Sequence, residues 1–120
     1  MENKIITLAV LREARIDENR TPFSPAQISN LLNKFSNLKI LVQPSKRRCF
    51  KDEDYLKAGA QITDDLSLAD IIFGVKEVEI STLIKDKIYL FFSHTSKVRQ
   101  YIGQVIKDKA IIYKKEYNTD

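Results

Sequence analysis

Two residues of this sequence have side chains that could move protons near neutral pH, and each stands where an apolar run ends. Lys76 directly follows the apolar run at residues 71–75, and His94 comes two positions after the run at residues 88–92. Histidine titrates near neutrality without help, and burial or neighbouring cations lower the pKa of a lysine toward the same range. Each residue also has an ordinary structural interpretation, since a lone histidine often only bonds a loop and a lysine often pairs with an acid.

Cations gather at the same kind of position, directly after other apolar runs. They are Arg12, Arg15 and Arg20 after the first run, and Lys46, Arg47 and Arg48 after the second. In an open parallel sheet, ligands bind beyond the carboxyl ends of the strands. A single loop cation is usually solvated surface, but the convergence of several on one sheet edge favours a binding site there.

Five continuous apolar runs supply the strands that would position these residues. They occupy residues 5–11, 40–42, 71–75, 88–92 and 110–113. Continuous rather than alternating runs are typical of parallel strands that are buried on both faces. Between these runs, apolar residues recur with the spacing of a helix. This happens first after Ser24 and Pro25, which suit an N-cap and a first turn, and again at residues 98–106. A short helix is expected at residues 52–58, ending at Gly59.

This alternation of strands and helices predicts an α/β fold. We expect a Rossmann-like (flavodoxin-like) domain with a mostly parallel sheet of about five or six strands and helices on both faces. A length of 120 residues fits one domain, and no linker or charge block divides the chain.

The composition excludes several classes of protein. The net charge of +4 is small for a dedicated nucleic-acid module, so no nucleic-acid partner is expected. The apolar runs fall far short of the ~20 residues that span a bilayer, and the start shows no signal peptide. We therefore expect a cytoplasmic protein without a membrane partner. One cysteine, Cys49, and one histidine cannot form a Cys/His zinc site, and no metal is expected.

Four segments resemble those of one enzyme superfamily, in the same order along the chain. They are Arg12 and Glu13 with residues 18–25, then residues 41–48, 74–78 and 89–97. Together they resemble the N-terminal domain of the alanine dehydrogenase, transhydrogenase and saccharopine dehydrogenase superfamily. The last three segments resemble in particular its lysine–ketoglutarate reductase branch, and the resemblance extends over nearly the whole chain.

The resemblance implies an enzyme of two Rossmann-like lobes with the active site in the cleft between them. Residues 1–120 would form a single N-terminal, substrate-side domain, and the nucleotide-binding domain would be absent from this chain. In keeping with this, Gly59, Gly74 and Gly103 stand too far apart for a glycine-rich phosphate loop. The implied cofactor is NAD(P), held mainly by the absent lobe, so we expect the isolated chain to be inactive.

The same resemblance assigns roles to five residues. Lys76 and His94 match the catalytic acid–base pair of the superfamily. Arg20 matches the arginine that holds a substrate carboxylate, and Lys97 resembles a lysine that binds a carboxylate in saccharopine dehydrogenases. Glu77, placed with the substrate-binding residues, resembles the glutamate beside the catalytic lysine, where it would adjust that group's pKa.

The implied function is the substrate-binding lobe, carrying catalytic residues, of an NAD(P)-dependent amino-acid dehydrogenase. Its ligand would be an amino acid or a 2-oxo acid, and the basic residues Lys46, Arg47, Arg48 and Lys97 favour lysine with 2-oxoglutarate. A lobe of an alanine dehydrogenase, acting with pyruvate and ammonia, is the close alternative. A stand-alone binding module without redox activity is another. The choice between NAD and NADP stays open, as does the oligomeric state, for which a homo-oligomer is one alternative.

Overall fold

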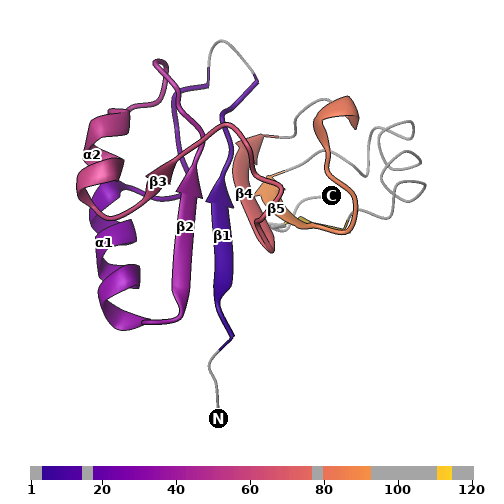
Figure 1. Ribbon diagram of the computed structural model, residues 1–120. Helices are drawn as coiled ribbons and strands as arrows, with labels where there is room; N and C mark the ends of the chain where they lie inside the picture. The colour runs from indigo at the N-terminus through magenta and orange to yellow at the C-terminus, as the bar shows by residue number, and fades with distance from the viewer. Residues whose placement is uncertain (1–3, 15–17, 77–79, 93–110, 115–120) are drawn as a thin grey trace.

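The computed structural model describes residues 4–14, 18–76, 80–92 and 111–114, and within them six strands form one parallel sheet (Figure 1). The strands are β1 (Ile6–Val10), β2 (Leu38–Val42), β3 (Gln61–Ile62), β4 (Ile71–Lys76), β5 (Ile88–Phe92) and β6 (Ile111–Lys114). Their order across the sheet is β3-β2-β1-β4-β5-β6, and every neighbouring pair is parallel. The expected Rossmann-like α/β fold is therefore confirmed.

The strand order reverses direction once, between β1 and β4. The chain runs from β1 outward to β2 and β3, then returns past β1 and continues outward to β4, β5 and β6. The carboxyl ends of β1 and β4 are therefore the topological switch point, where ligands bind in open α/β sheets. Without the two-residue β3, the order of the longer strands is the flavodoxin-like one.

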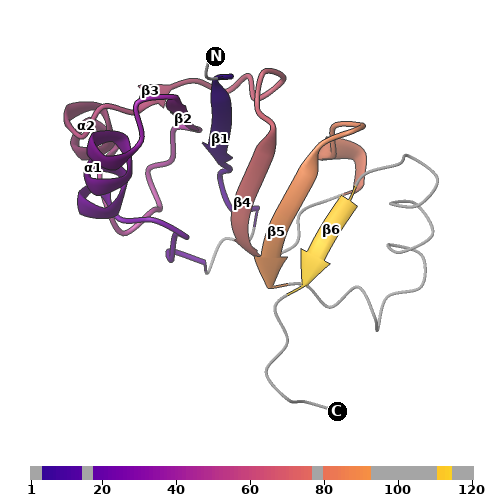
Figure 2. The ribbon, with the colours of Figure 1, turned by 90° about the horizontal axis from the view of Figure 1, so that it is seen from below.

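Two helices cover one face of the sheet (Figures 1 and 2). Helix α1 (Pro25–Lys34) begins at Ser24, whose hydroxyl accepts from the Gln27 amide while the Gln27 side chain accepts from the Ser24 amide. This reciprocal capping box, with proline in the first turn, explains why the helix starts there. Ile28 of α1 and Tyr55 of α2 (Asp52–Lys57) are fully buried, in one cluster with Val10, Ile40, Val42 and Ala60.

The opposite face of the sheet carries a second core without an α-helix among the described residues. It consists of Ala9, Leu11, Leu41, Leu66, Ala69, Ile72 and Tyr89, and Leu83 and Ile84 pack against it from the segment after the short 3-10 helix η1 (Ile80–Thr82). The second expected helix, at residues 98–106, lies outside the described residues. In the described ranges no helix has the length and hydrophobicity to cross a membrane.

The carboxylate of Asp70 connects β1 to the start of β4 at the amino end of the sheet. The Oδ2 atom of Asp70 accepts from the Thr7 amide at 2.8 Å, and the Asp70 amide donates to the Thr7 carbonyl at 2.7 Å. Because Asp70 directly precedes β4, these bonds align the starts of β1 and β4.

Helix α2 ends at Lys57 with Ala58 as its C-cap, and Gly59 follows as the stop that the sequence predicts. This residue has a φ of +107°, and a Cβ added there would lie 2.8 Å from Cδ1 of Leu32. Residues other than glycine rarely adopt such a φ. The turn therefore requires glycine both for its backbone conformation and for the space that a Cβ would fill.

Replacing Gly59 with alanine should lower the free energy of unfolding by about 1–2 kcal/mol from the backbone conformation alone, with the Leu32 contact adding to the loss. Chemical denaturation measures the change. Gly59→Asn is the matched control, because asparagine tolerates positive φ better while keeping the same Cβ, and it should lose less. Equal stability of the glycine and alanine proteins would contradict this account of the turn.

Candidate active site

The ladder between β1 and β4 ends just beyond the last residue of β1. The Leu11 amide donates to the Phe73 carbonyl at 3.0 Å. The next hydrogen bonds across the switch point come from a side chain, since the carboxylate of Glu13 accepts from two backbone amides of β4. Its Oε2 atom lies 2.8 Å from the Val75 nitrogen, and its Oε1 atom lies 2.9 Å from the Lys76 nitrogen. Glu13 is only 8% exposed, so an acid is buried at the place where ligands are expected.

The end of β4 is shaped to receive this carboxylate. The pairing of β4 with β5 shifts register between Phe73 and Lys76, so the strand is irregular there. A Cβ added at Gly74 would lie 3.0 Å from Cδ1 of Leu11 and 3.3 Å from Oε2 of Glu13. Such contacts are tight, so the missing side chain at Gly74 lets the segment after β1 lie close against β4.

Burial raises the pKa of Glu13 above its usual value of 4.5, because it removes the carboxylate from water. The hydrogen bonds from the Val75 and Lys76 amides act in the opposite direction and offset part of this cost, and the Arg48 charge adds a smaller contribution of the same sign. The charge of Glu18 raises the pKa further. Burying the Glu13 carboxylate therefore costs free energy, and the hydrogen bonds from the two amides reduce that cost.

A second acid, Glu18, is paired with Arg20 in a fork of parallel hydrogen bonds. Its Oε2 and Oε1 atoms each lie 2.9 Å from Arg20, at Nε and Nη2, and the Arg20 amide donates to Oε2 at 3.0 Å. The hydrogen bond from the Arg20 side chain is the main reason why the pKa of Glu18 falls to about 2. The Arg20 side chain is 68% exposed, so its guanidinium stays open to solvent while Glu18 holds one edge of it.

Lys76 is the last residue of β4 and is partly buried, with its backbone held by Glu13. After the larger effect of Arg20, its charge also lowers the pKa of Glu18. Glu13 in turn contributes a small part of the increase in the pKa of Arg20, which is due mainly to Glu18. The structure therefore binds the backbone of Lys76 to Glu13 and the side chain of Arg20 to Glu18.

The other three residues assigned from the sequence, Glu77, His94 and Lys97, lie outside the described residues. The roles of all five stay predictions. No group of three or more histidine, cysteine or acidic residues in the described segments is placed to hold a metal ion.

Arg48 differs from the expectation that the loop cations are solvated surface. Its side chain is only 4% exposed, with Nη2 donating to the Gln43 carbonyl at 2.9 Å and the guanidinium 5.3 Å from the centre of the Tyr55 ring. Burial lowers the pKa of Arg48, while Tyr55 and Asp52 act to raise it. Arg48 thus holds the loop after β2 in place, and it does not add to the case for a substrate with several carboxylates.

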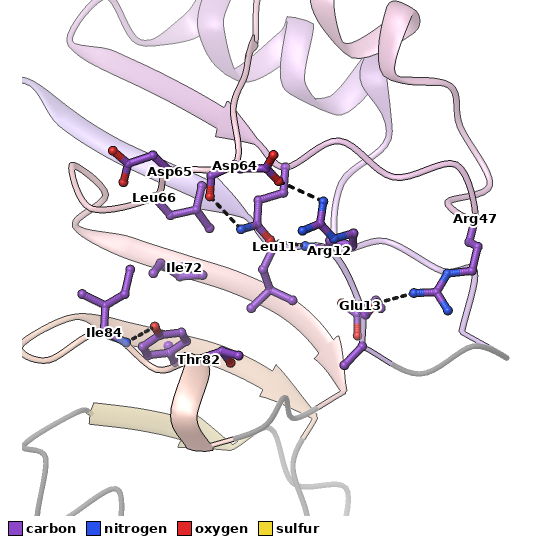
Figure 3. Close-up of a pocket in the computed structure, with 13 residues that line it drawn as sticks. Leu11, Arg12, Glu13, Arg47, Asp64, Asp65, Leu66, Ile72, Thr82 and Ile84 are labelled. Carbon is purple, nitrogen blue, oxygen red and sulfur yellow. Dashed lines mark hydrogen bonds and ion pairs between the residues drawn. The ribbon is translucent and has the colours of Figure 1, made fainter.

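A pocket of about 420 Å³ lies over the second core, beside the switch point (Figure 3). Its lining includes the apolar residues Leu11, Leu66, Ile72, Ile84 and Tyr89 and a set of polar residues, here called the rim, which are Arg12, Gln43, Arg47, Asp64 and Asp65. Glu13 also lines it, whereas neither Lys76 nor Arg20 is among the described residues that do.

The polar groups at the rim of this pocket form hydrogen bonds largely with one another and with nearby backbone. Arg12 Nη1 donates to the Pro44 carbonyl at 2.8 Å and to Asp64 Oδ1 at 2.9 Å. The Gln43 side chain accepts from the Arg12 amide at 2.7 Å and donates to the Asp64 carbonyl at 2.9 Å. Arg47 Nη2 donates to the Glu13 carbonyl at 3.1 Å. These rim groups already bond to one another and so connect the loops after β1, β2 and β3. This favours the switch point over the pocket as the place of chemistry.

Two acids that carry this arrangement received no role from the sequence. Glu13 and Glu18 both belong to the opening motif, yet only Arg20 of that motif was assigned. For Glu13 the position in the sequence was a usable signal. An acid three residues after a buried parallel strand must be either solvated or paired.

Stability at low pH should depend on Glu18. Its pKa of about 2 lies below the usual 4.5, so its contribution is present above pH 4.5 and is lost as the pH falls toward 2. Glu18→Gln should therefore flatten the decline of the free energy of unfolding across that range. Glu13, whose pKa is raised, acts above pH 4.5 instead, where its contribution falls as the pH rises.

Denaturation at a series of pH values measures this slope. Arg20→Met is the matched variant, since it removes the partner and should flatten the same part of the curve, with the double variant adding nothing more. An unchanged acid slope in Glu18→Gln would rule out the paired geometry.

Comparison with known proteins agrees with this geometry at the level of family. The model of the family described as alanine dehydrogenase/PNT, N-terminal domain, matches residues 9–120. The mitochondrial alpha-aminoadipic semialdehyde synthase of Bos taurus is 40% identical over 83 residues, which cover 69% of this chain and 9% of that protein. The alpha-aminoadipic semialdehyde synthase of Arabidopsis thaliana is 37% identical over 87 residues, covering 69% of this chain and 8% of that protein.

Alanine dehydrogenases are similar over more of the chain but at lower identity. One from Staphylococcus epidermidis is 28% identical over 111 residues, covering 88% of this chain and 30% of that protein. Among solved structures, an L-alanine dehydrogenase has a TM-score of 0.79 at 20% identity, covering 91% of this chain and 32% of its own. A transhydrogenase from Sinorhizobium meliloti also has a TM-score of 0.79, at 17% identity, with coverage of 90% and 34%. These structural likenesses establish the fold alone, and the chain spans only a small part of each relative.

Proposed function

Because the chain belongs to the alanine dehydrogenase/PNT N-terminal domain family, we propose that it is the substrate-side lobe of an NAD(P)-dependent amino-acid dehydrogenase, of saccharopine dehydrogenase or lysine–ketoglutarate reductase type. Residues 1–120 form this single domain, and a second lobe holds the nucleotide. The observation that carries the proposal is that two acids near the switch point hold these residues, Glu13 binding the backbone amide of Lys76 and Glu18 binding the side chain of Arg20. The higher identity to the two alpha-aminoadipic semialdehyde synthases favours the lysine branch over alanine dehydrogenase.

In this proposal Arg20 binds a carboxylate of a 2-oxo acid. Its guanidinium is charged at all relevant pH values, and Glu18 occupies only one of its edges, at Nε and Nη2. Holding that edge limits the rotation of the guanidinium, so the remaining N–H groups are presented in a fixed direction. Lys97 supplies the positive charge for a second carboxylate.

Lys76 and His94 move protons in the same proposal. Joining an amine to a 2-oxo acid releases water, and that step needs a group that gives a proton to the leaving oxygen and a group that takes one from the nitrogen. An amine and an imidazole can each give and take a proton, so the pair suits proton transfer in either direction. Glu77 adjusts the pKa of this pair.

The segment after β1 does not suit a nucleotide pyrophosphate. In dinucleotide-binding sheets a glycine-rich turn leads from the first strand directly into a helix whose N-terminus binds the pyrophosphate. Here the buried acid Glu13 occupies that turn, and α1 begins only at Pro25. NAD(P) is therefore assigned to the other lobe, and the isolated chain should not oxidise NAD(P)H in the presence of lysine and 2-oxoglutarate. A cytoplasmic location is proposed with it, although the bovine relative is described as mitochondrial.

Substitution of the acid–base pair tests this function. In a full-length relative that carries the same residues, Lys76→Met or His94→Gln should lower turnover by roughly 10²–10⁴, the usual effect of losing a general acid or base. Each variant should also lose one limb of the pH–rate profile. Lys39→Met is the control, because Lys39 is an exposed residue of β2, and its turnover should not change. Near-normal turnover in both folded variants would remove the catalytic assignment.

A further inference from the structure

We propose that Glu13 is a positioning residue whose carboxylate sets the end of β4 and thereby the placement of Lys76. The Glu13 clamp, meaning this carboxylate with the Val75 and Lys76 amides that it accepts, is a feature of the chain itself. Its consequence for turnover rests on the proposed function, in which Lys76 acts on substrate.

The clamp requires an irregular strand end. In a regular strand the N–H groups of successive residues point in opposite directions, so one acceptor group cannot reach both. Glu13 accepts from the successive residues Val75 and Lys76, at 2.8 Å and 2.9 Å. The register shift between Phe73 and Lys76 falls at the same place. The carboxylate therefore accepts hydrogen bonds from amides at the irregular end of the strand. The path of β4 into Lys76 depends on these bonds.

The backbone that carries this carboxylate is itself held in place, and Gly74 leaves room for the side chain. The Leu11 amide binds the Phe73 carbonyl at 3.0 Å, which fixes the chain two residues before Glu13. Arg47 Nη2 binds the Glu13 carbonyl at 3.1 Å. Gly74 leaves the space in which Oε2 approaches β4. Because these contacts fix Glu13, the position of the Lys76 backbone follows from the end of β1.

The chain offers a matched comparison at the other end of the same strand pair. Asp70 accepts from the Thr7 amide at 2.8 Å, so it too is a carboxylate that binds a strand amide across β1 and β4. It lies at the amino end of the sheet, away from Lys76. If both acids were merely structural, removing either one would affect stability and leave turnover and its pH profile alone.

Amide hydrogen exchange on the chain tests the clamp without reference to activity. In Glu13→Gln one amide faces the side-chain NH₂ in place of an acceptor, so exchange at Val75 and Lys76 should rise about tenfold or more. Asp70→Asn should raise exchange at Thr7 and leave those two amides unchanged. Unchanged protection of Val75 and Lys76 in Glu13→Gln would overturn the clamp. Should that variant not fold, Glu13→Asp keeps the charge but is one methylene too short to reach both amides, and the same criteria apply.

Kinetics in a full-length relative with these residues test the positioning role. Glu13→Gln or Glu13→Asp should lower kcat about 10- to 100-fold with a smaller change in KM, since a displacement on the order of 1 Å of a catalytic group costs about that much. The limb of the pH–rate profile that Lys76→Met removes should shift. Asp70→Asn should leave kcat and the profile unchanged.

The outcomes separate the two claims. Exposed amides together with unchanged kcat and pH profile would overturn the positioning role. Normal turnover in Lys76→Met would instead overturn the proposed function, and the exchange result would still decide the clamp.

Discussion

The arrangement at the switch point depends on a buried carboxylate that takes the place of a missing strand contact. Where β1 and β4 separate, the Glu13 side chain bridges the gap by accepting the amides of Val75 and Lys76. Burial raises its pKa, and the two amides offset part of that cost. An apolar residue at this position would avoid the desolvation cost but leave two backbone donors without these acceptors. The buried charge is therefore the solution to a hydrogen-bonding problem created by the topology.

Several other features surround this carboxylate. Gly74 must lack a side chain because Leu11 and Glu13 approach it closely. The Arg47 side chain joins the loop after β2 to the Glu13 carbonyl, and the side chain of Arg48 in the same loop is buried. The Glu18–Arg20 pair adds an exposed guanidinium beside the switch point. The neighbouring pocket, by contrast, has rim groups that bond to one another, so its polar atoms serve the fold.

The strands and helices could be predicted because their signals are local. Continuous apolar runs specified the parallel sheet, Ser24 and Pro25 marked the start of α1, and Gly59 marked the end of α2. The role of Glu13 could not be predicted because its partners come from a distant segment, whereas the burial of Arg48 depends on how the loop after β2 folds onto α2. Glu13 binds an amide 62 residues away, and Arg48 is covered by the ring of Tyr55. No spacing along the chain encodes the Glu13 contact, although the resemblance to a family pointed to the correct segment.

The central claim is that the switch point, and not the adjacent pocket, receives the carboxylate of a small acid. Titration of the isotopically labelled chain with 2-oxoglutarate, followed through its backbone amides by NMR, tests this most directly. The account predicts that the amides of Arg20, Val75 and Lys76 shift together along one saturation curve. Shifts confined to the pocket residues Leu66, Ile84 and Tyr89, or the absence of any shift, would contradict it.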